Sequence, residues 1–121
     1  MHAAADPSEL RELAVHAARE TGRLLQHHNE RGLRGLDTKS TATDMVSDAD
    51  REAEELLVQI LTDARPQDAL LGEEGAGREG TSGLRWVVDP LDGTTNFVFG
   101  YPQWAVSVAV ERIDDPAQAR R

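Results

Sequence analysis

Carboxylate side chains stand at the ends of two short apolar segments of this chain. Glu73 and Glu74 close the first segment, and Asp89 and Asp92 close the second. If the two segments are adjacent strands, their ends bring these carboxylates together. Crowded carboxylates repel one another unless they are protonated or neutralised by a cation, and hard oxygen ligands of this kind suit Mg²⁺ or Mn²⁺. The sequence therefore predicts a divalent metal site.

The segment that carries the two aspartates has further chemical content. It reads Asp-Pro-Leu-Asp-Gly-Thr-Thr-Asn over residues 89–96. Pro90 restricts its own φ to about −65° and Gly93 allows a close backbone approach, so a rigid turn is expected. If a helix begins after it, Thr94 and Thr95 offer hydroxyls and backbone amides to an anion. A metal beside an anion-binding turn indicates phosphate chemistry.

A purely structural interpretation of the same residues stays open at this level. Asp-Pro and Asp-Gly are common turn dipeptides, and a pair such as Glu73-Glu74 is typical of a solvated surface. A calcium-binding loop is excluded, because the spacing Asp-x-Asp-x-Asp-Gly with a later Glu does not occur around Asp92-Gly93.

Composition restricts the classes of function. The 121 residues hold 13 Lys and Arg against 22 Asp and Glu, a formal net charge of −9, which disfavours nucleic acid as a partner. Cysteine is absent, so thiolate chemistry is excluded and the chemistry must use oxygen or nitrogen. No apolar stretch approaches the roughly 20 residues that span a bilayer, so we expect a cytoplasmic protein without a membrane partner.

Two segments have the apolar spacing of amphipathic helices. The first covers residues 7–28, with Asp6 as its N-cap and a proline at the first helical position. The second covers residues 48–64, where Ser47 and Asp50 resemble a capping box. Complementary apolar stripes on the two helices favour packing against each other and over a sheet.

Three short apolar runs are predicted as strands, at residues 69–71, 86–88 and 105–110. The residues between the helices, 29–43, lack either period and are predicted as a loop. The glycine-rich stretch 75–83 has no G-x-G-x-x-G pattern and is predicted as a flexible loop, not as a phosphate cradle.

Taken together, the motifs resemble those of the inositol monophosphatase family of magnesium-dependent phosphomonoesterases. The family carries Gly-Glu-Glu, present at 72–74, and then Trp-x-x-Asp-Pro-[Leu/Ile]-Asp-Gly-Thr-x-Asn-Phe, present at 86–97. The resemblance also includes Lys39-Ser40, the segment 44–50 and the segment 101–107. It implies an α/β fold, in which this chain forms two helices packed on a partial sheet, the N-terminal part of a layered αβαβα sandwich.

The resemblance also implies roles for individual residues. Glu73, Asp89 and the carbonyl of Leu91 would hold one Mg²⁺, and Asp89 with Asp92 would hold a second, with Glu73 also near a weaker third. Thr94, hydrogen-bonded to Asp50, would orient a metal-bound water for in-line attack, so the catalytic set is Glu73, Thr94 and Asp50. The amides of Gly93 and Thr94, beside Asp92, would grip the phosphate. Mn²⁺ could replace Mg²⁺.

Several residues outside this set have structural alternatives. Asp50 could only cap the second helix, and Lys39, although it falls in a family motif, could only be a solvated loop charge. The four histidines, His2, His16, His27 and His28, lie outside every motif and are predicted to be surface residues. Trp86 and Trp104 flank strands and are predicted to be packing anchors.

The family is roughly twice as long as this chain and carries a later Trp-Asp-x-Ala motif that is absent here. We therefore expect residues 1–121 to be the N-terminal, metal-binding half of such a domain, acting on a small phosphate ester, with a homodimer implied by the resemblance alone. The alternative is a truncated, catalytically inactive fragment or interaction module that retains the metal-binding turn. Either way, an edge strand exposing Val106, Val108 and Val110 and a marginal stability are expected.

Overall fold

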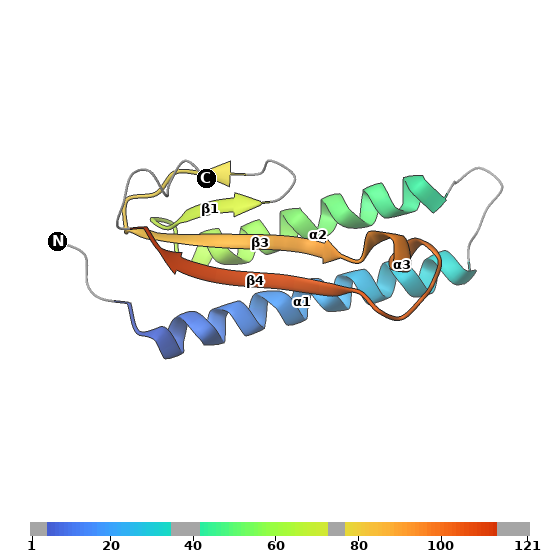
Figure 1. The fold of residues 1–121 in the computed structure, drawn as a ribbon, viewed down its shortest axis with the longest axis horizontal. Coiled ribbons are helices and arrows are strands. Elements are labelled where there is room, and N and C mark those ends of the chain that lie inside the picture. The colour runs from blue at the N-terminus through green and yellow to red at the C-terminus, as the bar shows by residue number, and fades with distance from the viewer. Residues whose placement is uncertain (1–4, 35–41, 73–76, 114–121) are drawn as a thin grey trace.

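The computed structural model describes residues 5–34, 42–72 and 77–113, with only the backbone described for 32–34 and 42–45. Its elements follow one another as helices, strands, a short helix and a last strand (Figure 1). Their bounds are α1 Pro7–Arg34, α2 Ala42–Ala64, β1 Ala69–Gly72, β2 Gly77–Arg78, β3 Leu84–Asp92, α3 Thr94–Val98 and β4 Ala105–Arg112. The chain is a mixed helix and sheet structure, as its sequence predicts.

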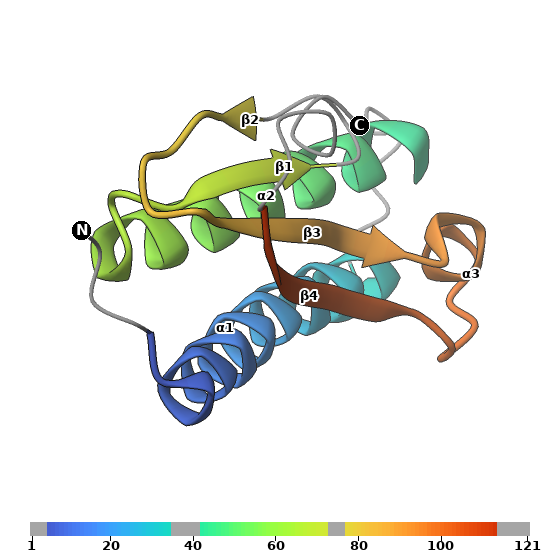
Figure 2. The same cartoon turned by 60° about the vertical axis from the view of Figure 1, so that its left-hand side comes forward.

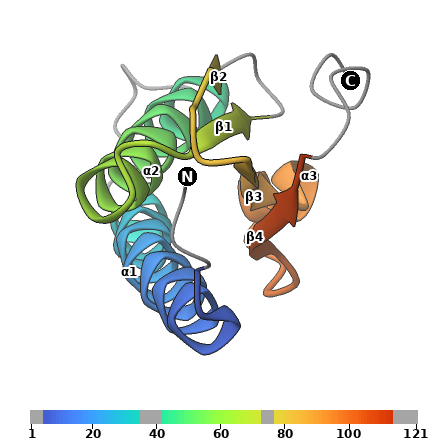
Figure 3. The same ribbon diagram turned by 90° about the vertical axis from the view of Figure 1, so that its left-hand side faces the viewer.

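The four strands form one sheet in the order β2-β1-β3-β4, with β1 parallel to β3 and the other pairs antiparallel. Both long helices lie on the same side of this sheet (Figure 3). Helix α1 packs against α2 and β4, and α2 packs against β3. The two long helices therefore cover one face of the sheet, and no helix among the described residues covers the other face (Figure 3). Val106, Val108 and Val110 of β4 are half-buried toward the helices, so the prediction that these valines are exposed is wrong.

The core lies between the helices and the covered face of the sheet. Its larger cluster joins both helices to β1 and β3 through Leu10, Ala17, Leu57, Leu61, Leu70, Trp86 and Val88. A second cluster joins the other ends of the helices to the end of β3 and to α3 through Leu25, Ala49, Ala53, Leu91 and Phe97. Burial of these apolar side chains is what holds the end of β3 in place.

Helix α1 begins where it is predicted, and it ends later. Asp6 caps it, since the Ser8 amide donates to Asp6 Oδ1 at 2.9 Å. The helix continues to Arg34, so the predicted loop start at residue 29 is wrong. His28 Nε2 contacts Glu52 on α2 and its side chain is only 20% exposed, so the prediction of a surface histidine is also wrong there. Contact with α2 extends the helix beyond what local propensity favours.

Helix α2 begins at Ala42, not after Ser47. Ser47 and Asp50 are therefore inside the helix, and the predicted capping box is wrong. The added turns are held by tertiary packing, because Val46 and Ala49 join the cluster around Leu91. His16 and His27 are exposed on α1, which agrees with the prediction that they are surface residues.

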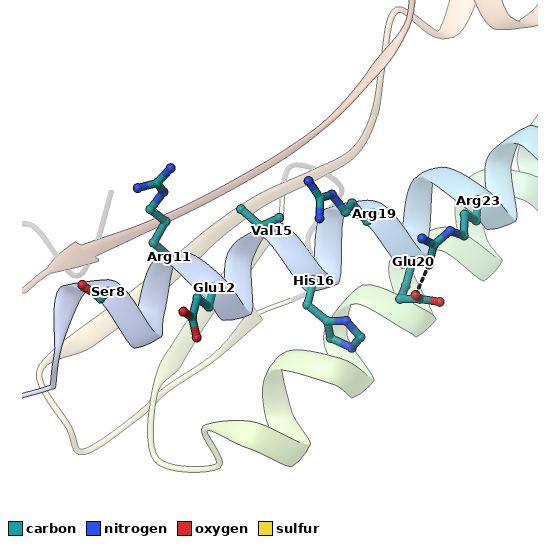
Figure 4. Close-up of a pocket in the computed structure, with 8 residues that line it drawn as sticks. All are labelled: Ser8, Arg11, Glu12, Val15, His16, Arg19, Glu20 and Arg23. Atoms are coloured by element: carbon teal, nitrogen blue, oxygen red, sulfur yellow. Dashed lines mark hydrogen bonds and ion pairs between the residues drawn. The ribbon is translucent and has the colours of Figure 1, made fainter.

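The side of α1 turned away from the core is a solvated, mixed-charge surface (Figure 4). Arg23 and Glu20 form an ion pair on it, and Val15 is 38% exposed among the charged side chains. Exposed pairs of this kind contribute little to stability. This surface accounts for the amphipathic pattern that predicts the helix.

The predicted flexible loop at 75–83 is partly ordered by the sheet. Gly77 and Arg78 form β2, and the Arg78 guanidinium donates to the backbone carbonyls of Arg65 and Asp68 at 3.2 and 3.0 Å. The amides of Thr81 and Ser82 both donate to the Gln67 carbonyl, at 2.8 and 3.1 Å. This segment is tied to the start of β1, which the absence of periodicity does not reveal.

Asp68 is the centre of that connection. Its side chain is 1% exposed, and both carboxylate oxygens accept hydrogen bonds. Arg65 Nε donates at 2.8 Å, Ser82 Oγ at 2.7 Å and Trp86 Nε1 at 2.9 Å. One carboxylate thus joins the end of α2, the segment before β3 and β3 itself, and Trp86 is the packing anchor that the sequence predicts.

We expect the stability of the chain to fall in acid partly through Asp68. Burial opposes ionisation, but the hydrogen bonds from Arg65, Ser82 and Trp86 outweigh it and hold the pKa of Asp68 below its usual 3.8. As pH falls, the Asp68 carboxylate is therefore protonated in the unfolded chain before it is protonated in the folded chain. Its ionised form contributes fully to the free energy of unfolding above pH 3.8, and this contribution is lost as pH falls through the lower, folded-state pKa. Urea unfolding at a series of acidic pH values measures this loss.

The Asp68→Asn variant tests this assignment, because it cannot take up that proton. Its free energy of unfolding should depend less on pH than that of the unaltered chain over the acidic range. Asp63→Asn, a change at an exposed α2 carboxylate, serves as the control. Identical pH slopes for the Asp68→Asn variant and the unaltered chain would refute the role of Asp68.

Candidate metal and phosphate site

The predicted site residues lie where β3 ends and α3 begins, at one end of the sheet (Figure 2). β3 is longer than its predicted apolar run and includes Asp89 to Asp92. Of the segment 89–96 that is predicted as a rigid turn, residues 89–92 are thus the last part of a strand and residues 94–96 belong to α3. The short helix α3 begins at Thr94, so the condition for anion-binding amides at this point is present.

An irregularity in the ladder shapes this end of β3. Asp89 pairs with Ser107, whereas Asp92 pairs with Ala105, so one extra residue is accommodated on β3 between them. Pro90 lies inside the irregular stretch, and it has no N–H to give to a ladder. Such a bulge bends the strand and redirects its side chains. Pro90 and Leu91 are consequently both buried, while Asp92 is exposed.

Hydrogen bonds hold three of the predicted site residues to one another. The Leu91 amide donates to Asp89 Oδ1 at 3.2 Å, and Thr94 Oγ1 donates to the Leu91 carbonyl at 3.4 Å. The Leu91 side chain is buried between the helices, which holds its backbone in place. The carboxylates of Asp89 and Asp92 and the carbonyl of Leu91 are therefore presented by one restrained segment.

Gly93 has the backbone conformation that this segment needs. Its φ is 90° and its ψ is 38°, in the left-handed region, and it directly precedes α3. A Cβ at this position would lie 3.0 Å from the Gln103 carbonyl oxygen and 3.2 Å from Trp104 Cα. The same loop is also held by Asn96, whose Nδ2 donates to the Gln103 carbonyl at 2.8 Å. Trp104 contacts Phe97 edge to face, with ring centroids 5.3 Å apart, and so is a packing anchor as predicted.

Replacing Gly93 by Ala should destabilise the chain by about 1–3 kcal/mol, because it adds left-handed strain and a steric contact. Gly83→Ala is the matched control, since Gly83 has φ 84° but no atom within 4 Å of the added carbon. Urea unfolding of both variants separates the two effects. Equal decreases in the free energy of unfolding of the two variants would show that the contact with the Gln103 carbonyl does not contribute to the destabilisation.

Of the remaining predicted site residues, the structure describes Asp50 but not Glu73 or Lys39. Asp50 is half-buried on the part of α2 where Ala49 and Ala53 pack against Leu91 and Phe97. β1 ends at Gly72, which pairs with Val88, the residue before Asp89. Glu73, which follows Gly72, and Lys39 lie outside the described residues. The assignment of Glu73, the bond between Thr94 and Asp50 and the role of Lys39 stay predictions.

The donor set fits a hard divalent cation in its chemistry. Two carboxylates, of Asp89 and Asp92, and the Leu91 carbonyl lie at the same end of β3, and oxygen donors are the ligands that Mg²⁺ prefers. Among the side chains that the structure describes, no three carboxylates or imidazoles form a group that could hold a metal ion by themselves. Completion of the site would therefore need a donor from outside the described residues, as the resemblance implies for Glu73.

Sequence reasoning missed Asp68 and the glycine at position 80, which lie away from this site. Asp68 is three residues after Arg65, a spacing that could indicate an ion pair, but nothing in the sequence indicates its burial.

No helix among the described residues has the length and apolar character needed to cross a membrane.

Comparisons with known proteins identify relatives for most of this chain. The model of the inositol monophosphatase family matches residues 6–116. Inositol-1-monophosphatase of Rhizobium meliloti is 57% identical over 70 residues, which are 57% of this chain and 26% of that protein. The Nus factor SuhB of Pseudomonas aeruginosa is 44% identical over 104 residues, 80% of this chain and 37% of that protein.

A solved structure shows the same arrangement of elements. The extragenic suppressor protein SuhB from Bartonella henselae superimposes with a TM-score of 0.73 at 39% identity, over 86% of this chain and 39% of that one. The chain thus spans well under half the length of these relatives. The matched family model and the shared fold show that this chain belongs to the inositol monophosphatase family.

Proposed function

We propose that this chain is the N-terminal, metal-binding half of a Mg²⁺-dependent phosphate monoester hydrolase. The observation that carries the proposal is the restrained segment at the end of β3, which presents Asp89, the Leu91 carbonyl and Asp92 directly before α3. Membership of the inositol monophosphatase family supports this chemistry. We infer inositol monophosphate or a related sugar phosphate as the substrate.

In this proposal Asp89 and Asp92, the Leu91 carbonyl and Glu73 hold two or three Mg²⁺ ions, or Mn²⁺ in their place. A divalent ion bound there supplies an activated water and neutralises charge on the phosphoryl oxygens. The chain itself has a net charge of −9, so an anionic substrate needs that neutralisation to approach.

The protein's own contribution is to orient the reacting groups. In this proposal Thr94 and Asp50 of α2 together orient a metal-bound water, and Thr94 Oγ1 also donates to the Leu91 carbonyl. In this proposal the backbone amides of Gly93 and Thr94, at the start of α3, donate to the phosphate oxygens, because the first amides of a helix have no acceptor within it. The bulge at Pro90 and the left-handed Gly93 keep Thr94 and the two amides in one segment with the proposed metal ligands Asp89 and Asp92.

The test is phosphate release from inositol monophosphate by the purified chain, with and without Mg²⁺, together with calorimetric titration of Mn²⁺. Fructose bisphosphate and a bisphosphate nucleotide are assayed in parallel to define the substrate class. Mg²⁺-dependent release of phosphate from the sugar phosphate is expected. Binding of Mn²⁺ without release from any ester would replace the proposal by the alternative, an inactive fragment or interaction module that retains the metal-binding segment.

A further inference from the structure

Asn96 on α3 holds the segment that joins this helix to β4. Its side-chain Nδ2 donates to the Gln103 carbonyl at 2.8 Å, and its backbone carbonyl accepts from the Tyr101 amide, also at 2.8 Å. No described backbone amide donates to the Gln103 carbonyl, so the side chain of Asn96 supplies the hydrogen bond that fixes this peptide group. One side chain on α3 therefore sets where the chain lies as it enters β4, which begins at Ala105.

The peptide group that Asn96 fixes is the one against which Gly93 packs. A Cβ on Gly93 would lie 3.0 Å from the Gln103 carbonyl oxygen and 3.2 Å from Trp104 Cα, so the two backbone segments meet with no side chain between them. Gly93 has φ 90° and ψ 38°, a conformation that glycine adopts readily and that other residues rarely adopt. Because the contact is this close, a displacement of the Gln103 carbonyl changes the space in which the Gly93 backbone is held.

The restraints on the two sides of Gly93 are unequal. On the side of β3, the Leu91 side chain is buried and Asp92 pairs with β4. On the other side stands α3, which has five residues, too few for a helix that is stable by itself. The orientation of α3 therefore depends on its tertiary contacts, which include the buried Phe97 and the hydrogen bond of Asn96.

We propose that Asn96 is a positioning residue for the reaction at the neighbouring site. Through the Gln103 carbonyl it keeps Gly93 in the left-handed conformation, and Gly93 in turn sets the direction in which Thr94 and the first amides of α3 leave the end of β3. The inference rests on the proposed function, in which Thr94 orients the attacking water and these amides hold the phosphate. Because Asn96 acts through its neighbours, its substitution should disturb this orientation and leave the proposed metal ligands in place.

The first test measures the backbone conformation of Gly93. Asn96→Ala removes the donor without adding a charge, and Gln103→Ala is the matched control, because it truncates an exposed side chain and keeps the carbonyl that Asn96 binds. Nuclear magnetic resonance of the full 121-residue chain measures the three-bond couplings of the Gly93 amide proton to its α protons, which depend on φ. These couplings should change in Asn96→Ala only. Gly83, with φ 84° at the other end of β3, is the internal reference and should be unaltered in both variants.

The second test measures Mg²⁺-dependent phosphate release by the same two variants. We expect kcat/KM for inositol monophosphate to fall by at least about tenfold in Asn96→Ala, since a misplacement of about 1 Å can cost about 100-fold. Mn²⁺ affinity, from calorimetric titration, should stay nearly unchanged, because Asp89, Leu91 and Asp92 belong to β3 and not to α3. Gln103→Ala should match the unaltered chain in both measurements.

Unchanged Gly93 couplings in a folded Asn96→Ala chain would overturn the proposal, because Asn96 would then contribute to stability alone. Changed couplings with an unaltered kcat/KM would overturn it as well. Absence of phosphate release by the unaltered chain would refute the proposed function and the catalytic part of this inference, while the couplings would still decide whether Asn96 controls Gly93. If Asn96→Ala does not fold, the couplings are measured in Asn96→Asp, which keeps the size of the side chain and lacks the donor.

Discussion

Replacing Asp89 by Asn is expected to lower Mg²⁺-dependent phosphate release by at least about 100-fold, since even outer partners of metal ligands are worth about 10–100-fold. Asp89 is the carboxylate that the proposed site shares between two ions. Asn keeps the side-chain oxygen that accepts from the Leu91 amide at 3.2 Å, so the bulge should be retained while the charge is lost. Phosphate release and Mn²⁺ affinity should therefore fall together, with the thermal unfolding midpoint nearly unchanged.

Asp63→Asn is the matched control for this change. It removes the same charge from an exposed position near the end of α2, away from the end of β3, and should leave both activity and Mn²⁺ affinity unaltered. Full activity of the Asp89→Asn variant would refute the metal role. A large fall in its unfolding midpoint would instead assign Asp89 to the stability of the bulge.

Replacing Gly80 by Ala is expected to destabilise the chain by about 3 kcal/mol or more, at the upper end of what overpacking costs. The added carbon would lie 2.3 Å from the Ala69 amide nitrogen and 2.5 Å from the Gln67 carbonyl oxygen. Both are backbone atoms at the start of β1, so they cannot move aside as a flexible side chain could. Relief would disturb the hydrogen bonds that Thr81 and Ser82 donate to Gln67.

Gly22→Ala on α1 provides the comparison, because no atom lies within 4 Å of its added carbon. That variant should be more stable than the unaltered chain by about 0.5–1 kcal/mol, since Ala is the better helix former. Urea unfolding of the two variants measures both signs. A Gly80→Ala chain as stable as the unaltered one would show that residues 79–83 can leave the start of β1 without cost.

Metal and phosphate chemistry could be predicted from the sequence because its residues are contiguous. Asp89, Leu91, Asp92, Gly93 and Thr94 lie within six positions, so their chemistry depends on local order more than on distant contacts. The same holds for the start of α1, where Asp6 and Pro7 act within the first turn. The positions of the apolar runs also predicted the strands, since each run had to be buried against a helix.

Element lengths and the long-range links needed the tertiary structure. The end of α1 and the start of α2 are stabilised by packing and by the contact of His28 with Glu52, which lies 24 residues away. Pro90 appeared to end a strand, yet β3 continues through it, because pairing with β4 is present on both sides of the bulge, at Asp89 and at Asp92.

What the sequence determined by itself is the family motif of residues 86–97 and the class of elements around it, because these depend on residue types and near neighbours. The tertiary structure alone decided that residues 77–83 are anchored to the start of β1 and that Asp68 is buried and accepts a hydrogen bond from Trp86. Each of these features depends on contacts between segments far apart in the chain. The pattern of residues within one segment does not indicate whether such contacts are favourable.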